Sequence, residues 1–501
     1  YMLWADTSNN ILKMRNSAND DWIDLRTLTG GITSSADATI NSLTVGKGAN
    51  SVAGNTVLGE SALDASVSGG NNTAIGINAL TANTSGNANT CVGNRTGESI
   101  TTGSNNSFFG SLAGENTSTS DFNCAFGQEA LEANTTGASN VAMGFRALEE
   151  NTTASNNTAV GSQALKANTT GTSNVAVGAN ALDANTTADN NTAIGKSSLS
   201  TNTTGTSNTG CGLDTLTLNT TGSNNTAVGR GALDANTTAD NNTAVGHHSL
   251  LSNTTGTSNA GLGTYSLDAN TTGDQNTAVG VNALTANTTA SNNTAVGKDA
   301  LRDNTTADNN TAVGAFSLLS NTTGADQVAI GRKALQDNST GGANTAVGVN
   351  ALQNCTTGSS NTAVGNSAMD SLTTGGTNVS LGMNTLASLT TVSNCTAIGY
   401  NALNANTSGQ ENTAVGSNAM DANTTGNYND AFGRDALGAG SGFTSCCAFG
   451  NSALKMNTGS DNSAFGFLAL GANTSGEKNV AFGSQALDAN TTGNQQVAIG
   501  F

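Results

Sequence analysis

The sequence contains no proline, and several other residue types are scarce. Only 16 of its 501 residues are lysine or arginine, and aromatic residues make up 4% of the chain. Because proline removes a backbone donor, a chain without it suits a structure in which nearly every N–H joins a hydrogen-bond ladder. The formal net charge of −18 argues against nucleic acid and anionic membranes as partners, since both attract clustered lysine and arginine.

Other absences narrow the function. No stretch is apolar enough to cross a membrane, so we expect no membrane insertion, and no signal peptide is visible. The nucleophile elbow, the P-loop and the dinucleotide fingerprint are missing, so we predict that the protein is not an enzyme and holds no cofactor. The chain begins at Tyr1 rather than at methionine, and we expect it to be a fragment of a longer protein.

Metal and disulfide chemistry is also sparse. The seven cysteines show no CxxC spacing and fall at five different phases of the repeat described below, so neither a zinc site nor a disulfide framework is predicted. His247 and His248 are the only histidines, and as neighbours on a strand or corner they are expected to point apart and make a poor metal pair. Acidic residues are scattered singly, as at Asp183 and Asp234, and we interpret them as keeping the chain soluble.

What is present is a 17-residue repeat. The pentapeptide Asn-Thr-Ala-Val-Gly stands at residues 157–161 and again at 242–246. Its closing glycine recurs from Gly59 to Gly500 in 26 intervals, 25 of which are 17 residues long. A phase held this strictly predicts an all-β, parallel β-solenoid (a β-roll) of about 27 coils. Twenty-six steps of about 4.8 Å predict a rod of roughly 125 Å.

Each coil is expected to contain two strands and two turns. The segment before the closing glycine alternates with period two and predicts a short strand. Ala164-Leu165 predicts a second strand or an extended return, and residues 168–171, Asn-Thr-Thr-Gly, predict a wide turn. We expect the large residue before the glycine and the leucine four after it to fill the interior, and the asparagine four before it to form an amide ladder. The predicted core stack is Val160, Val177, Val228, Leu165, Leu182 and Leu233, and the predicted ladder includes Asn72, Asn157, Asn174, Asn191, Asn225, Asn242 and Asn276.

The ends of the array differ from its middle. Residues 1–28 predict a β-hairpin module with a third strand, residues 29–43 a linker, and residues 44–501 the solenoid. Trp4 and Trp22 are interpreted as the core of a small knob, with a sugar-stacking pair as the alternative. Bulky residues precede the glycine near both ends of the array and are expected to act as caps: Phe109, Phe126, Phe432, Phe449, Phe465 and Phe482.

The coils closed by Gly110 and Gly127 are the most divergent. Gly97 and Gly114 replace the usual leucine, and Phe108 replaces the small residue of the strand. We expect Phe108 to fill the space that leucine leaves, with a local binding site as the alternative.

The thin core favours an oligomer. Each coil offers about two large apolar side chains, worth roughly 1.5–3 kcal/mol each when buried. Ordering 17 residues opposes this by about 1 kcal/mol or more per residue. The small residues Ala159, Ala176 and Ala244 form a row, and we expect this row to pack against partner chains around a shared axis.

The repeat resembles two known groups. Residues 140–144, Asn-Val-Ala-Met-Gly, and residues 174–178 are similar to the Asn-Ser-Val-Ala-Ile-Gly repeat of trimeric autotransporter adhesin heads. The longer unit, with Ala-Leu and Asn-Thr-Thr-Gly added, resembles tail-fibre and appendage proteins of bacteriophages and related viruses, as does the N-terminal module. The resemblance implies a left-handed β-roll that assembles as a homotrimer. The 17-residue period is longer than the adhesin repeat.

The predicted function follows from this resemblance and from the repeat. We expect a structural rod, the shaft of a viral tail fibre or extracellular appendage, on a virion surface or outside a cell. A host receptor or glycan would bind through regions outside this fragment. A bacterial adhesin head is the alternative. Ice binding through threonine ladders is a minor one, because Thr169 and Thr170 are adjacent and lie in a turn.

Overall fold

The computed structural model describes residues 3–6, 11–15, 22–25, 37–40 and 43–501. The chain divides into two units, Tyr1–Thr187 and Ala188–Phe501. In each unit the repeats form an all-β parallel solenoid with a 17-residue period, which confirms the predicted fold. A 3-10 turn, Ala49–Ser51, is the only helical element among the described residues.

The first strands pair antiparallel. Strands β1 (Leu3–Asp6), β2 (Ile11–Arg15) and β3 (Trp22–Leu25) form a three-stranded sheet in that order. The side chains of Trp4 and Trp22 lie outside what the structure describes. Strand β4 (Ala38–Ile40), within the predicted linker, pairs antiparallel with β5 (Leu43–Gly46), and β5 pairs antiparallel with β6 (Thr56–Gly59). The parallel ladder therefore begins at β6, and the segment at residue 44 runs against it.

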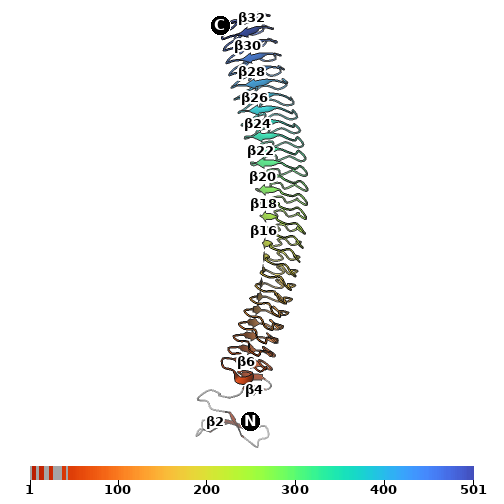
Figure 1. Ribbon diagram of the computed structural model, residues 1–501, viewed down its shortest axis with the longest axis vertical. Helices are drawn as coiled ribbons and strands as arrows, with labels where there is room; N and C mark the ends of the chain where they lie inside the picture. The colour runs from red at the N-terminus through yellow and green to blue at the C-terminus, as the bar shows by residue number, and fades with distance from the viewer. Residues whose placement is uncertain (1–2, 7–10, 16–21, 26–36, 41–42) are drawn as a thin grey trace. The chain divides into compact units, whose positions relative to one another are not determined.

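From β6 onward each strand is the segment just before a closing glycine. Thr226 of β16 faces Thr243 of β17, and Val228 faces Val245, so identical positions lie above one another. In Figure 1 the arrows of the second unit lie one above the next along one side of the stack. The first unit continues with β7 Thr73–Ile75, β8 Thr90–Val92, β9 Ser107–Phe109, β10 Cys124–Phe126, β11 Val141–Met143, β12 Thr158–Val160 and β13 Val175–Val177. The second unit contains β14 Thr192–Ile194, β15 Thr209–Cys211, β16 Thr226–Val228, β17 Thr243–Val245, β18 Ala260–Leu262, β19 Thr277–Val279, β20 Thr294–Val296, β21 Thr311–Val313, β22 Val328–Ile330, β23 Thr345–Val347, β24 Thr362–Val364, β25 Val379–Leu381, β26 Thr396–Ile398, β27 Thr413–Val415, β28 Asp430–Phe432, β29 Cys447–Phe449, β30 Ser463–Phe465, β31 Val480–Phe482 and β32 Val497–Ile499.

The predicted second strand is absent from the coil. The stretch around Ala164-Leu165 is a chain of turns, because Gln163 (φ 59°) and Leu165 (φ 51°) adopt left-handed backbone conformations. The backbone nevertheless stays paired between coils. The N–H of Gln163 donates to Phe145 O of the preceding coil at 2.8 Å, and the N–H of Leu165 donates to Ala181 O of the following coil at 2.9 Å.

The strand turns its small residue inward, which corrects the predicted core stack. Leu165, Leu182 and Leu233 are fully buried, and so is Ala159 at the middle of its strand. The valines face outward instead. Val177 is 36% exposed and Val228 37%, while Val160 is half-buried. The predicted face was therefore wrong: Ala lines the coil and Val lies on its surface.

The narrow interior explains this orientation. Inside the coil, the middle residue of the strand faces the side chain of the residue that lies three positions after a closing glycine, as Gly210 faces Ser198 and Thr215. At Gly210 an added Cβ would lie 2.4 Å from Ser198 Oγ. The same compensation occurs at Gly261, where Ser249 and Ser266 have their hydroxyls 2.8 Å apart. A larger serine thus accompanies a smaller glycine, which shows how little volume the interior leaves at this level.

Phe108 is the largest side chain at the inward position of a strand, where Val57 of β6 is also larger than alanine, and its setting agrees with the expected repacking. It is fully buried. A Cβ added to Gly114 would lie 2.4 Å from its ring, and one added to Gly97 would lie 3.4 Å from it. The ring therefore occupies the space that leucine side chains fill in other coils.

Two rows of buried asparagine tie successive coils together. The seven asparagines of the predicted ladder are all fully buried. They bond chiefly to the backbone: Asn157 Nδ2 donates to Gly171 O at 2.9 Å, and Asn157 Oδ1 accepts from the N–H of Asn174 at 2.9 Å. A direct amide-to-amide ladder forms instead at the asparagine that opens the Asn-Thr-Thr turn. From the sequence we expected only a turn at this residue. There Asn151 Nδ2 donates to Asn134 Oδ1 at 2.9 Å, and Asn168 Nδ2 donates to Asn151 Oδ1 at 3.0 Å.

Candidate interaction surface

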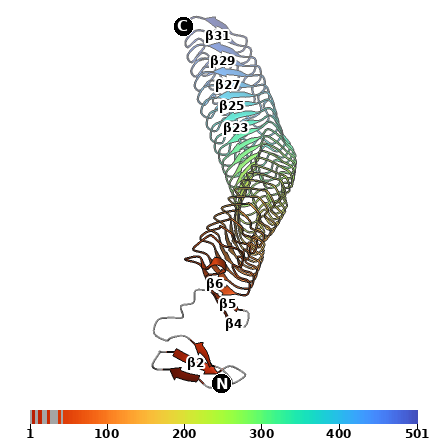
Figure 2. The same ribbon diagram turned by 60° about the horizontal axis from the view of Figure 1, so that its bottom comes forward.

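The outward side of the strands is the most distinctive surface of each unit. We define the strand face as the outward first and last residues of the strands from β6 onward. In the second unit the strands share one side, as Figure 2 shows for β23 to β31. The last residue of every strand there is apolar: Ile194, Cys211, Val228, Val245, Leu262, Val279, Val296, Val313, Ile330, Val347, Val364, Leu381, Ile398, Val415, Phe432, Phe449, Phe465, Phe482 and Ile499.

Further exposed apolar residues follow the closing glycine. Val281, Met383 and Phe467 are among them. In the first unit a shallow groove on the same kind of face is lined by Leu58, Ile75 and neighbouring residues of β5 to β7. Contiguous apolar surface of this extent is uncommon on monomeric soluble proteins and usually marks a contact with another molecule.

The phenylalanines expected to cap the stack lie on this face, which corrects their predicted role. Phe126 is 47% exposed and Phe482 58%. They stack on one another across coils. The ring centroids of Phe109 and Phe126 are 4.4 Å apart, and those of Phe432 and Phe449 are 4.6 Å apart. Because they occupy the valine position, they project outward and do not close the interior.

Charged residues flank the strand face of the second unit with opposite signs. We call the residue after each closing glycine the trailing rim. The residues five and six positions before each closing glycine form the leading rim. The charged residues of the trailing rim are exposed and all basic: Lys196, Arg230, Lys298, Arg332 and Arg434. Apart from Lys478, those of the leading rim are acidic: Asp189, Asp240, Asp274, Asp308, Asp326, Glu411, Asp461 and Glu477.

Some acidic residues have a structural task that the sequence did not reveal. Asp240 Oδ1 accepts the N–H of Ser223 at 2.6 Å, and Asp274 Oδ1 accepts the N–H of Thr257 at 2.6 Å. Serine does the same elsewhere, since Ser291 Oγ accepts the N–H of Asp274 at 3.0 Å. These side chains satisfy backbone donors in the turn that precedes the strand.

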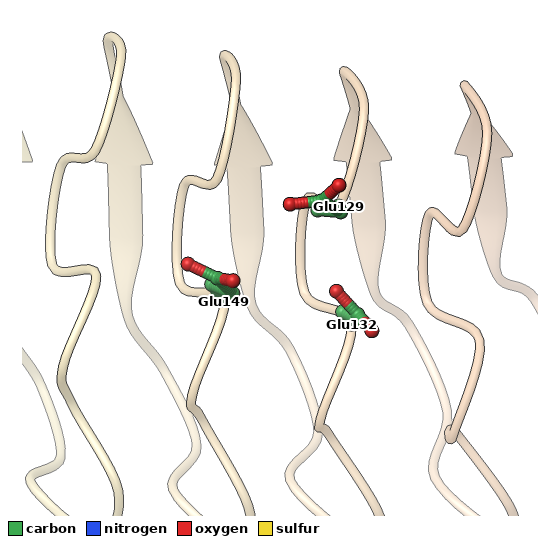
Figure 3. Close-up of side chains that lie close together, drawn as sticks. All are labelled: Glu129, Glu132 and Glu149. Carbon is green, nitrogen blue, oxygen red and sulfur yellow. The ribbon is translucent and has the colours of Figure 1, made fainter.

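Stacked glutamates form a second charged feature, in the first unit. Glu129, Glu132 and Glu149 offer carboxylate oxygens within 4.8 Å of one another (Figure 3). Arg146 Nε lies 2.6 Å from Glu129 Oε2, and Lys166 Nζ lies 3.8 Å from Glu149 Oε2. Partial burial and the neighbouring carboxylates raise the pKa of Glu132. Three carboxylates could hold a cation, but basic side chains already neutralise two of them.

The two histidines do not point apart, which corrects the sequence prediction. Their rings stack with centroids 3.8 Å apart, and Tyr265 meets His247 edge-on at 5.4 Å. His248 has a left-handed backbone (φ 54°), which folds its side chain back onto that of its neighbour. Because the two rings are nearly parallel, their nitrogen lone pairs lie in separate planes and do not converge on one metal ion. The pair therefore remains a poor metal ligand.

Four of the seven cysteines are buried: Cys91, Cys355, Cys395 and Cys446. All seven cysteines are free thiols. Burial raises the pKa of Cys355 and of Cys446 to about 11 and holds the pKa of Cys91 well above its ordinary value. Thiolates, the reactive form, are therefore scarce at neutral pH. The asparagine of the Asn-Thr-Thr sequon at Asn168 is fully buried and bonded within its ladder.

Comparison with protein-family models, curated proteins and solved structures finds no match for this chain. Among the described residues, no helix has the length and apolar character needed to cross a bilayer. The relation to tail fibres and adhesin heads therefore stays an expectation that rests on the repeat motif.

Proposed function

We propose that this chain is a structural shaft segment of a fibre or appendage outside the cell, in the manner of a viral tail fibre. One observation carries the proposal: within each unit, each coil bonds to the next around its circumference. Strand pairing joins one side, the turn backbone joins the other, and two asparagine rows link the interior. A stack of this kind supports itself, and its length grows with the number of coils.

The location on a virion or in the extracellular space is supported by the repeat motif alone, and an adhesin head is the alternative with the same support. Immunogold electron microscopy of native particles and cells tests the location. Label along an external fibre supports the shaft. Label confined to the cell interior would contradict both the shaft and the adhesin head, and label on a bacterial surface without virions would favour the adhesin.

One specific observation favours the minor alternative, ice binding. The strands present threonine outward as well as valine, as at Thr243 and Val245 of β17. A bare, regular Thr–Val face would produce thermal hysteresis in a nanolitre osmometer. A shaft segment is expected to show none.

A further inference from the structure

We propose that residues 37–52 form a cap, which keeps the first coil, the one that begins at β6, from pairing end to end with a coil of another chain. Every coil presents hydrogen-bonding groups along both of its edges, because strand pairing and turn bonding recur at each step. A stack of like coils can therefore extend at any edge that is left open. The inference goes beyond the shaft function and does not depend on where the protein is located.

The first part of the cap is β5, which occupies the outer edge of the first parallel strand. The N–H of Thr56 donates forward to the next coil, so alternation along β6 turns the backbone groups of Val57 and Gly59 the other way. Their register partners on β5 are Gly46 and Thr44. Because β5 runs antiparallel to β6, it uses these groups without adding a coil.

Asp37 fastens the base of the β4–β5 hairpin. Its Oδ1 accepts the N–H of Lys47 at 2.6 Å, and its Oδ2 accepts the N–H of Gly48 at 2.6 Å. A Cβ added to Gly46 would overlap the carboxylate, so a glycine at this position leaves room for it. Hydrogen bonds from backbone amides to a carboxylate are charge-assisted and stronger than neutral ones. One side chain thus holds the turn that leads from the hairpin to the first coil.

The segment after β5 is the second part of the cap and covers the turn side of the first coil. The N–H of Ala49 donates to Leu63 O at 3.1 Å, and Asn50 Nδ2 donates to Val67 O at 2.9 Å. Gly48 packs on the leucine, since an added Cβ would lie 3.0 Å from Leu63 Cβ. Leu63 is fully buried beneath this segment. The cap therefore closes both the strand side and the turn side of the coil.

The last coil of the described array shows what an uncovered coil exposes. Val497 of β32 is 71% exposed. Leu487 stands at the phase of Leu63 but is only half-buried. The N–H of Val497 faces away from β31, because the equivalent N–H of Val480 donates forward to the next coil. An edge of this kind offers its backbone groups to a further coil.

Without the cap, the edge of β32 in one copy would match the first coil of another copy. Residues 497–499 would face residues 56–58 in the register that joins β6 to β7. The N–H of Val497 would then donate to Asn55 O, as the N–H of Thr56 donates to Asn72 O. A head-to-tail contact of this kind does not close on itself and produces filaments.

The test compares three proteins that each comprise residues 1–501. The uncapped variant carries Asp37→Ala, which removes both acceptors at the hairpin base, and Thr44→Pro, which removes the donor that β5 directs at β6. The control carries Asp64→Ala, at an exposed acid of the first coil, and Thr44→Val, which keeps the backbone donor. The third protein is the wild type.

Negative-stain electron microscopy and sedimentation velocity measure particle length and mass. We expect the wild type and the control to share one particle length, and the uncapped variant to form filaments of about twice that length or more at unchanged width. Unchanged width separates this growth from lateral association. Loss of the first coil does not alter the expected result, because β7 presents the same kind of edge beneath it.

A mixing experiment tests whether the filaments grow from coil to coil. The wild type offers the edge of β32 but not that of β6, so it should join a filament and end its growth. About a tenfold excess of wild type is expected to shorten the filaments to about one or two chain lengths. Aggregates held by other contacts would keep their length.

Three results would overturn the proposal. They are a wild type that already forms filaments, an uncapped variant whose particle length equals that of the control, and filaments that excess wild type does not shorten. Each of them would leave the shaft proposal standing, because the location of the protein is measured separately.

Discussion

Leucine in a left-handed backbone conformation recurs through this chain four residues after a closing glycine, and Leu112 and Leu468 adopt it two residues after one. Leu284 is typical, with φ 52° and a fully buried side chain. The left-handed region costs a residue with a Cβ about 1–2 kcal/mol. Burial of a leucine side chain contributes about 1.5–3 kcal/mol. Burial therefore offsets the backbone strain, and the same residue serves both as turn and as core.

Side-chain shape at this position should matter more than volume. Leu284→Ile keeps the volume, but a β-branched residue is strongly disfavoured in the left-handed region, so we expect a loss of roughly 1–3 kcal/mol. Leu284→Met should cost less than about 1.5 kcal/mol, as Met369 and Met420 stand at the same phase with φ 50°. Guanidinium unfolding measures both. Equal stability of the two variants would contradict this account of the turn.

Removal of one ladder asparagine should leave several buried groups unpaired. Asn270 Nδ2 donates to Asn253 Oδ1 at 2.8 Å and to Gly273 O at 3.0 Å, and its own Oδ1 accepts from Asn287 at 2.8 Å. Asn270→Ala is expected to cost about 2–4 kcal/mol, since each unsatisfied buried group costs about 1–3 kcal/mol. Hydrogen exchange of β18 to β20 should accelerate. Thr272→Ala, at an exposed turn residue, serves as the control and should leave exchange unchanged.

The coil is the element of this fold, and neighbouring coils influence one another through stacked side chains. Glu115, Glu132 and Glu149 stand at one phase of three successive coils, where like charges lie close together. Such stacking destabilises a ladder. The pKa of Glu132 is raised above its ordinary value of 4.5 by partial burial and by these neighbours.

The raised pKa sets a direction for stability against pH. Because folding raises the pKa of Glu132, protonation favours the folded state. Its stabilising contribution is full below the unfolded pKa and is lost as pH rises through the folded pKa. Glu132→Gln should therefore raise the thermal midpoint at pH 7 and have little effect at pH 3. A variant that lowers the midpoint at pH 7 would show that the carboxylate stabilises its coil.

Part of the coil was predictable from the sequence because it repeats. The period, the strand before the glycine and the buried leucine follow from phase and residue type. The side of the strand that faces inward does not, since alternation defines two faces without saying which is inside. Paired substitutions carry that information: Gly261 is small where Ser249 and Ser266 are larger.

The second side of the coil could not be read for a different reason. Leucine carries no local preference for the left-handed region, so Ala164-Leu165 looked extended. The sequence also did not indicate the left-handed conformation of His248 (φ 54°), so the stacking of the two histidines was not predicted. The strand face and its rims became visible only once the outward direction was known, since valine was assigned to the interior.

For the whole molecule, the coil count should be adjustable without loss of the fold. Deletion of residues 277–293 removes 17 residues and joins Asn276 to Thr294, which preserves the Asn-Thr-Ala-Val sequence. We expect an unchanged circular dichroism spectrum and a cooperative transition close to that of the wild type. Deletion of residues 277–284 breaks the phase and should unfold the neighbouring coils. Equal tolerance of both deletions would contradict a strict 17-residue register.

A cryo-EM reconstruction of the purified protein, at a resolution that separates strands about 4.8 Å apart, is the sharpest test of how the coil is built. We expect one short strand per 17-residue coil, with alanine inside and valine outside. Density with valine inside the coil, or with a second strand in place of the turns around the buried leucine, would rule this coil out.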